Sequence, residues 1–181
     1  EDHCTLTTPI LSSGGGAGLV YDAGGRQLYV YRDRKQVFSL PVEAGRTILA
    51  ASLSAQGRLV VVTQASGVKG SVTVYDESFQ PVLGVSLSSR FITDAILSPD
   101  GTTLALTTAG QTGGVFDSQV AFYRLSRPSG NDDPDAVCSL GSNTVLALRW
   151  TSPERTREHI LRCCAHQFPQ GDVQHWWHEI G

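Results

Sequence analysis

Histidine and cysteine are the residues of this 181-residue chain best suited to metal binding or nucleophilic chemistry, and most of them lie after residue 153. His159, Cys163 and His166 stand at positions i, i+4 and i+7, a spacing that places them on one face of a helix. His175 and His178 follow a few residues later. Zinc prefers thiolate and imidazole ligands, so these residue types permit a zinc site. Ligand type is the only support for such a site.

Two further clusters have residue types that bind ions. The acidic segment Asn131–Asp135 carries carboxylates that suit calcium, but it lacks the alternating spacing and central glycine of a calcium loop. We therefore expect a solvated turn there. The glycine-rich segment Gly14–Gly18 has no strand before it and no Lys-Ser/Thr pair after it, as a phosphate-binding loop requires. We expect residues 1–17 to form a flexible lead-in.

Catalytic relays are not predicted in the first 150 residues. The only histidine there is His3, so no Ser–His or Cys–His pair can form within that region. Cys4 and Cys138 can form a disulfide if the chain is exported, whereas the adjacent Cys163 and Cys164 suggest packing. This part of the chain is predicted to be non-catalytic.

The elements that position these residues are predicted to be short strands between Gly18 and Trp150. Runs rich in β-branched and aromatic residues alternate with turns at Gly24-Gly25, Gln56-Gly57 and Asp100-Gly101. The clearest runs are Leu28–Tyr31, Arg58–Thr63, Ser71–Tyr75 and Thr103–Thr107. Strands this short with turns this frequent predict an antiparallel, all-β structure.

The strand region also repeats. Ile48–Gly57 matches Phe91–Gly101, and a third start occurs at Val145–Pro153. A repeat of roughly 40–50 residues with four short strands per unit is typical of propeller blades. We predict a partial propeller of two to three four-stranded blades over residues 18–153; the alternative is a β-sandwich with coincidental similarity.

Residues 14–152 resemble a bacterial β-propeller-like family of uncharacterised function. The matching segments are Gly18–Asp22, Ala50–Thr63, Val72–Asp76 and Ile92–Thr107. The resemblance implies a propeller fold and a location at the cell envelope or outside the cell, with the cytoplasm as the alternative; it implies no reaction.

Residues 154–181 differ in composition from the rest. Apolar residues from Ile160 to Phe168 follow a helical spacing, Thr151 or Ser152 can cap a helix, and Pro169 can end it. We expect a C-terminal helix followed by an irregular tail. The change falls inside a predicted blade rather than in a linker, which favours a join between two unrelated sequences.

This tail resembles a short segment of glycoside hydrolase family 94, the cellobiose and chitobiose phosphorylases. The matching residues are Arg157–Arg162, Ala165–Phe168 and the string from Gly171 to His178. The resemblance implies inverting phosphorolysis of a β-linked disaccharide, with inorganic phosphate as co-substrate. The sugar-facing residues that it implies are Gln174, His175, Trp176, Trp177 and His178. The chain ends before the family's catalytic aspartate and phosphate ligands. This resemblance accounts for the histidines and cysteines without a metal, so we predict no metal site.

Composition excludes several function classes. The net charge is −3 and the pI about 5.9, so no basic field exists to attract nucleic acid. No apolar run approaches the ~20 residues that span a bilayer. The chain has no methionine, and we expect a processed product or a fragment of a longer protein.

The prediction that follows is a non-catalytic binding or scaffold module of the cell envelope that needs no cofactor. We expect it to self-associate through its open blade edges or to be marginally stable. The alternative is a phosphorylase fragment that binds an oligosaccharide.

Overall fold

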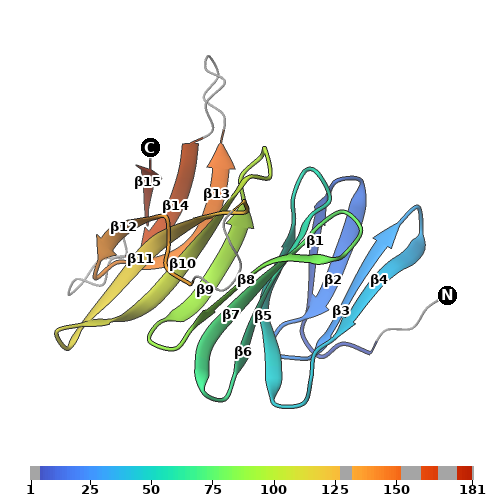
Figure 1. Cartoon of the computed structure of the whole chain (residues 1–181), viewed down its shortest axis with the longest axis horizontal. Helices are drawn as coiled ribbons and strands as arrows, with labels where there is room; N and C mark the ends of the chain where they lie inside the picture. The colour runs from blue at the N-terminus through green and yellow to red at the C-terminus, as the bar shows by residue number, and fades with distance from the viewer. Residues whose placement is uncertain (1–4, 127–131, 152–159, 167–174, 181) are drawn as a thin grey trace.

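The computed structural model describes the backbone of residues 5–126, 132–151, 160–166 and 175–180. All regular structure in these ranges is β-strand, and the strands form four antiparallel sheets that follow one another in chain order (Figure 1). Within each sheet, strands consecutive in sequence are also neighbours in space. The predicted all-β architecture of four-stranded antiparallel units is therefore confirmed.

Three sheets have four strands and the last has three. The first sheet consists of β1 (Pro9–Gly14), β2 (Ala17–Asp22), β3 (Gln27–Arg32) and β4 (Lys35–Pro41). The second consists of β5 (Arg46–Leu53), β6 (Leu59–Ala65), β7 (Val68–Tyr75) and β8 (Pro81–Leu87). The third consists of β9 (Phe91–Leu97), β10 (Thr103–Thr112), β11 (Val115–Arg124) and β12 (Ala136–Gly141). The fourth consists of β13 (Thr144–Thr151), β14 (Ile160–His166) and β15 (His175–Ile180).

The sheets are arranged as blades. The first strand of each sheet contacts the first strand of the next, so that β1, β5, β9 and β13 form a series along one side of the molecule. This is the arrangement expected when short sheets radiate from a common centre. We call the three four-stranded sheets blades 1, 2 and 3.

Two equivalent turns confirm the repeat that the sequence predicts between Ser54 and Ser98. The Gly57 amide bonds to the Ser54 carbonyl, and the Gly101 amide bonds to the Ser98 carbonyl. Both glycines have a positive φ, 84° and 70°. In each turn the serine hydroxyl accepts a backbone N–H a few residues later. The turns differ by one residue in length, yet their geometry is shared.

The core lies between the blades rather than within one layer. Side chains of β6 are buried on both faces: Leu59 and Val61 pack toward blade 1, and Val60 and Val62 toward blade 3. A smaller cluster, which includes Ala105 and Val145, joins blade 3 to the fourth sheet. A sheet covered on both faces requires a continuous apolar run, which explains why β6 does not alternate apolar and polar residues.

The structure corrects two expectations about the chain ends. Pro9–Gly14, expected within a flexible lead-in, pairs with β2 as strand β1. Ile160–His166, expected to be helical, forms strand β14 between β13 and β15. The helix prediction is wrong there because apolar residues with strand propensity pair with β13, whose backbone groups need partners. The proposed capping residue Ser152 and the helix terminator Pro169 lie outside the described residues.

Among the described residues, no helix is long and apolar enough to cross a membrane.

Candidate functional site

The residues that the phosphorylase resemblance implies are only partly described. His175, Trp176, Trp177 and His178 lie in β15, and Gln174 lies outside the described residues. The pairing places His175 opposite His166, and His178 opposite Cys163. The sugar-facing role of these residues stays a prediction.

Because β14 is a strand, the helical face on which the candidate zinc site depended is absent from Ile160–His166. Cys163 and His166 were expected on one helical face, but both belong to strand β14, so the helical spacing that grouped them does not apply. His159 lies outside the described residues. Within the described part of the chain, no group of three or more His, Cys, Asp or Glu side chains is placed to hold a metal ion.

Residues of the acidic segment act within the fold. Asp132 accepts a hydrogen bond from the backbone amide of Ser86 on β8 at 3.2 Å. Asp135 accepts one from the amide of Arg124 at 2.7 Å. These carboxylates bind protein N–H groups rather than facing only solvent as expected; Asn131 lies outside the described residues.

Asp94 is a half-buried carboxylic acid beside the first strand of the fourth sheet. Its oxygens accept hydrogen bonds from the amides of Ala95 at 2.8 Å and Leu148 at 3.3 Å. Burial raises the pKa of Asp94, and these two hydrogen bonds oppose the rise. The hydrogen bond from the Leu148 amide joins blade 3 to the fourth sheet, so Asp94 stabilises the contact between these two sheets.

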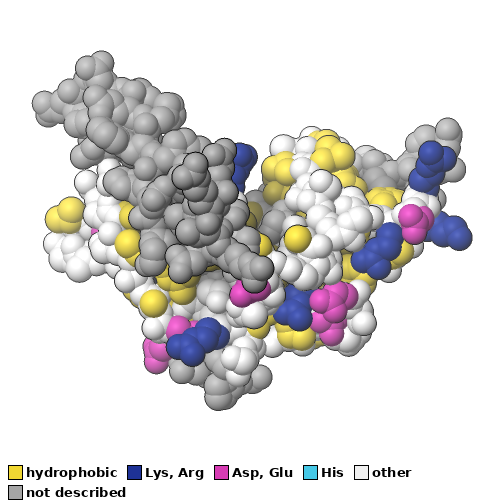
Figure 2. Space-filling view, turned by 90° about the horizontal axis from the view of Figure 1, so that it is seen from above, with side chains coloured by type: hydrophobic (Ala, Val, Ile, Leu, Met, Phe, Trp, Pro, Cys, Tyr) yellow, Lys and Arg dark blue, Asp and Glu magenta, His cyan; other side chains and the backbone are white. Residues whose placement is uncertain are grey.

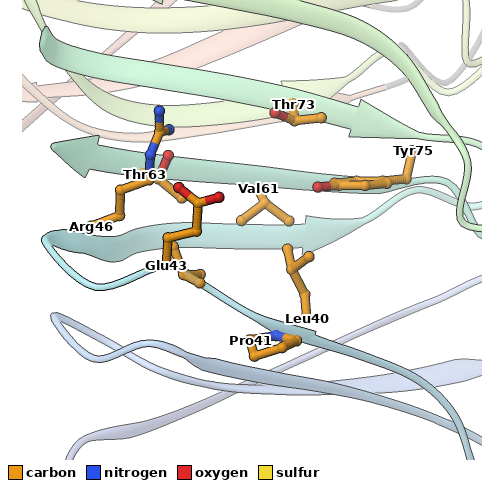
Figure 3. Close-up of a pocket in the computed structure, with 9 residues that line it drawn as sticks. Leu40, Pro41, Glu43, Arg46, Val61, Thr63, Thr73 and Tyr75 are labelled. Atoms are coloured by element: carbon orange, nitrogen blue, oxygen red, sulfur yellow. The ribbon is translucent and has the colours of Figure 1, made fainter.

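A polar cleft opens between blades 1 and 2 (Figure 3). It has a volume of about 310 Å³ and is lined by Leu40, Pro41, Val42, Glu43, Arg46, Val61, Thr63, Thr73 and Tyr75. The Tyr75 ring lies along the cleft, with its hydroxyl directed toward Val61 in Figure 3. Burial raises the pKa of Tyr75, and a hydrogen bond with the Thr73 side chain opposes this. Glu43 belongs to the exposed loop at the cleft mouth, whereas Arg46 begins strand β5 and is half-buried.

A second cleft, between blades 2 and 3, has a different character. It has a volume of about 510 Å³ and is lined by Lys69, Ser89, Phe91, Ala109, Gly110, Gln111 and Phe116. We call it the aromatic cleft. Phe91 is 42% exposed and Phe116 is 39% exposed. Because water hydrates aromatic rings unfavourably, exposed rings at a concave site are typical of binding surfaces.

The strand register explains why the two rings share this cleft. Phe91 of β9 stands opposite Ala109 of β10, and Gln111 of β10 stands opposite Phe116 of β11. Directly opposite residues lie on the same face of a sheet, as do residues two apart in one strand. Phe91, Ala109, Gln111 and Phe116 therefore lie on one face of blade 3.

Lys69 supplies the charge of the aromatic cleft from the opposite wall. Its ammonium lies 5.1 Å from the centroid of the Phe91 ring and donates a hydrogen bond to the Ser89 carbonyl at 3.0 Å. An ammonium has three donors, so this single bond leaves others for a ligand. Lys69 is the charged member of the lining, which makes the cleft suited to an anionic group.

Arg90 stabilises the β10–β11 hairpin through contacts on the face opposite Gln111 and Phe116. Its guanidinium donates to the Thr108 hydroxyl at 2.9 Å, to the Asp117 carboxylate at 3.1 Å and to the Asp117 carbonyl at 3.0 Å. The hydrogen bond from Arg90 lowers the pKa of Asp117. A Cβ on Gly110 would lie 2.9 Å from the guanidinium, so glycine makes room for it. Arg90 is thus neutralised and holds the hairpin in place.

The aromatic cleft was missed from the sequence. Phe91 was recognised only as the start of a repeat, and Phe116, which follows Gly113-Gly114, belonged to no predicted element. The signal that could have found it is the length of this hairpin: β10 and β11 have ten residues each and extend past β9. On the face shown in Figure 2, positive and negative side chains are interspersed among the described residues.

Comparisons with known proteins agree with the fold. A structure of the Dos1 propeller superposes with a TM-score of 0.58 at 13% identity, over 86% of this chain and 40% of that one. The β-propeller domain of Myceliophteria thermophila Cps50 (Swd1) gives a TM-score of 0.55 at 16% identity, over 94% of this chain and 56% of that one. This chain therefore spans 40% and 56% of the lengths of these two propellers.

No curated protein matches the sequence significantly, and none of the comparisons supports the expected resemblance of the tail to glycoside hydrolase family 94. One family model does match, over residues 1–146, and its description is a family of unknown function, DUF5711. Because the match begins ahead of β1 and includes all three four-stranded blades, this propeller-like chain belongs to the DUF5711 family.

Proposed function

We propose that this chain is a non-catalytic binding module that recognises a protein partner through the aromatic cleft. The observation that carries the proposal is the pair of exposed rings, Phe91 and Phe116, on one face of blade 3 beside Lys69. Aromatic side chains are enriched at the energetic centres of protein interfaces because they bury a large area at low entropic cost. Location at the cell envelope remains a prediction from the sequence resemblance.

The chemistry of the lining supports binding. It offers two aromatic rings, one ammonium, one amide and the backbone of a hairpin. These groups recognise a ligand by contact and hydrogen bonding, and none of the lining side chains forms a nucleophile–base pair. The polar cleft is a weaker candidate, because its carboxylate, Glu43, stands at an exposed loop where water solvates it and none of the described residues that line it is an exposed aromatic ring.

Selection of a random peptide library displayed on phage against the purified chain tests this proposal. We expect the selected peptides to share a pattern and to lose about tenfold or more of their affinity on Phe116→Ser, as the loss of an aromatic anchor implies. Val37→Ser is the matched control: Val37 is 43% exposed and lies on β4 of blade 1. We expect the control to bind like the unchanged chain.

Two outcomes would contradict the proposal. One is the failure of any peptide pattern to emerge from the selection. The other is a set of selected peptides whose affinity is unchanged by both Phe116→Ser and Phe91→Ser, since their contacts would then lie elsewhere.

A further inference from the structure

The tip of the β10–β11 hairpin has an open edge beside the aromatic cleft. Strand β9 begins at Phe91, which stands opposite Ala109, so β10 has no partner on this side from Gly110 to Thr112 among the described strands. The same three residues remain paired with β11 on their other side. A short stretch of sheet edge therefore borders the cleft.

The turn at the tip decides which backbone groups face this edge. Gly113 and Gly114 have positive φ angles of 61° and 81°, as in the two-residue type I′ turn that joins paired strands. Such a turn is closed by a hydrogen-bonded pair, here Thr112 and Val115, and hydrogen-bonded and non-hydrogen-bonded pairs alternate along the ladder. Gln111 and Phe116 then form a non-hydrogen-bonded pair, so the N–H and C=O of Gln111 point away from β11 toward the open edge.

We infer that an extended peptide adds to this edge as a further strand, pairing with Gln111 and placing an apolar side chain against Phe91 and Phe116. This inference rests on the proposed function of the aromatic cleft and names how the partner binds. Main-chain hydrogen bonds to an exposed sheet edge supply affinity, and pockets for alternate side chains supply specificity. The edge and the two rings are adjacent here because Gln111 lines the cleft together with Phe91 and Phe116.

Charge complementarity specifies the peptide further. Lys69 is the charged residue of the cleft, and its ammonium has donors beyond the one used by Ser89. Arg90 is occupied by Asp117 on the other face. The peptide segment therefore carries an aspartate or glutamate next to its apolar anchor.

The hydrogen bonds of Arg90 reduce the conformational entropy that is lost when a partner strand binds. A free hairpin tip loses conformational freedom when a partner strand binds, which weakens binding. The three hydrogen bonds of Arg90 fix the hairpin before the partner arrives. The edge is thus pre-organised for pairing.

The test uses a defined probe, a synthetic capped octapeptide that alternates valine and threonine around one central aspartate, titrated into the isotopically labelled chain by NMR. We expect saturable shifts at Gln111, Phe116 and Lys69. The same peptide with N-methyl groups on alternate backbone amides should lose about tenfold or more in affinity, because N-methylation removes main-chain donors. Lysine in place of the aspartate should weaken binding through repulsion by Lys69.

Two matched variants of the protein itself test whether the backbone of Gln111 pairs with the peptide. Gln111→Pro removes the N–H that faces the partner at a non-hydrogen-bonded position of the β10–β11 pair, where proline is tolerated. Gln111→Ala keeps this N–H and removes only the side chain. We expect the proline variant to lose binding and the alanine variant to keep it, with both retaining the NMR spectrum of the folded chain.

The outcomes separate this inference from the proposed function. If the octapeptide shifts the cleft residues but N-methylation and Gln111→Pro change nothing, strand addition is wrong while the cleft remains a binding site. If the octapeptide shifts no cleft residue, strand addition of an acidic peptide is overturned, and the phage selection decides the proposed function independently.

Discussion

At the scale of single residues, half-buried polar groups in this chain connect neighbouring sheets. The hydroxyl of Ser52 bonds to the Ala95 carbonyl, Arg58 bonds to the Gly101 carbonyl at 2.8 Å, and Asp94 bonds to the Leu148 amide. Each of these contacts crosses from one sheet to the next. Polar groups that are satisfied in this way specify how neighbouring sheets align.

Asp94 gives a pH dependence whose sign can be worked out. Its pKa is raised in the folded chain above the ordinary value of 3.8, so the folded state binds this proton more tightly than the unfolded state. Stability then decreases as the pH rises from 3.8 through the raised pKa. We expect Asp94→Asn to abolish this decrease.

Urea unfolding followed from pH 3.5 to 7 measures the effect of Asp94→Asn, with Asp33→Asn in an exposed turn as the control. The difference between Asp94→Asn and the unchanged chain should vary with pH, whereas the Asp33→Asn difference should stay constant. A pH-independent Asp94→Asn difference would show that the carboxyl titrates alike in both states.

The residues of β15 give a second prediction at this scale. We expect cello- and chito-oligosaccharides not to bind this chain, because His175–His178 are paired in a strand with β14 and the chain lacks the catalytic aspartate and phosphate ligands of glycoside hydrolase family 94. Isothermal titration calorimetry checks this. Saturation at a dissociation constant of about 1 mM or tighter would contradict the expectation and restore the carbohydrate interpretation.

At the scale of elements, close approach between blades depends on particular glycines. A Cβ on Gly14 would lie 2.5 Å from the Leu53 carbonyl oxygen, and one on Gly15 would lie 2.4 Å from Gly57. These residues were expected to belong to a flexible segment. Their function in the fold is instead to let the β1–β2 hairpin lie against the turn between β5 and β6.

Gly70 provides the element-scale prediction. A Cβ at Gly70 would lie 2.9 Å from the backbone nitrogen of Ile92, so Gly70→Ala forces blades 2 and 3 apart. We expect a loss of roughly 1–3 kcal/mol in the free energy of unfolding, as for other overpacked positions. Urea denaturation measures it.

The matched control is Gly84→Ala on the neighbouring strand β8, where an added Cβ meets no atom within 4 Å. We expect Gly84→Ala to be neutral or to stabilise the chain by about 0.4–1 kcal/mol through the unfolded state. Equal effects of the two substitutions would mean that the packing of β7 against β9 is looser than described.

At the scale of the whole molecule, blade 1 has one covered and one uncovered face. In β2, Leu19 and Tyr21 are buried against blade 2, whereas Val20 is half-buried on the other face. Leu11, opposite Val20, is 79% exposed. An apolar depression of about 440 Å³ is lined by Leu11 and Val20 together with Gly18 and Tyr31. Among the described residues, blades 2 and 3 are each packed against a neighbouring sheet on both faces.

This asymmetry predicts the solution behaviour of the chain. We expect concentration-dependent self-association in sedimentation velocity, weakened by about tenfold or more in Leu11→Lys because a charge would be buried at the contact. Val82→Lys, on the outer strand of blade 2, should not change it. A compact monomer at all concentrations that melts cooperatively would contradict the prediction.

The strand class, the blade repeat and the turns at Gly24-Gly25, Gln56-Gly57 and Asp100-Gly101 could be predicted from the sequence. These follow from local chemistry: β-branched runs such as Val60–Val62 favour strands, and Gly57 and Gly101 adopt the positive φ that their turns require. The 44-residue offset between Ser54 and Ser98 appears in both sequence and structure because each turn uses the same hydrogen bonds.

Three features required knowledge of the packed fold: whether Ile160–His166 is a helix or a strand, whether Gly14–Gly16 is a linker or a turn, and where the aromatic cleft forms. Helical and strand periodicities are hard to separate in a short apolar segment, and pairing with β13 settles the matter. The aromatic cleft brings residues of blades 2 and 3 together across more than 40 positions of sequence. Such proximity depends on how two sheets pack, which no local pattern encodes.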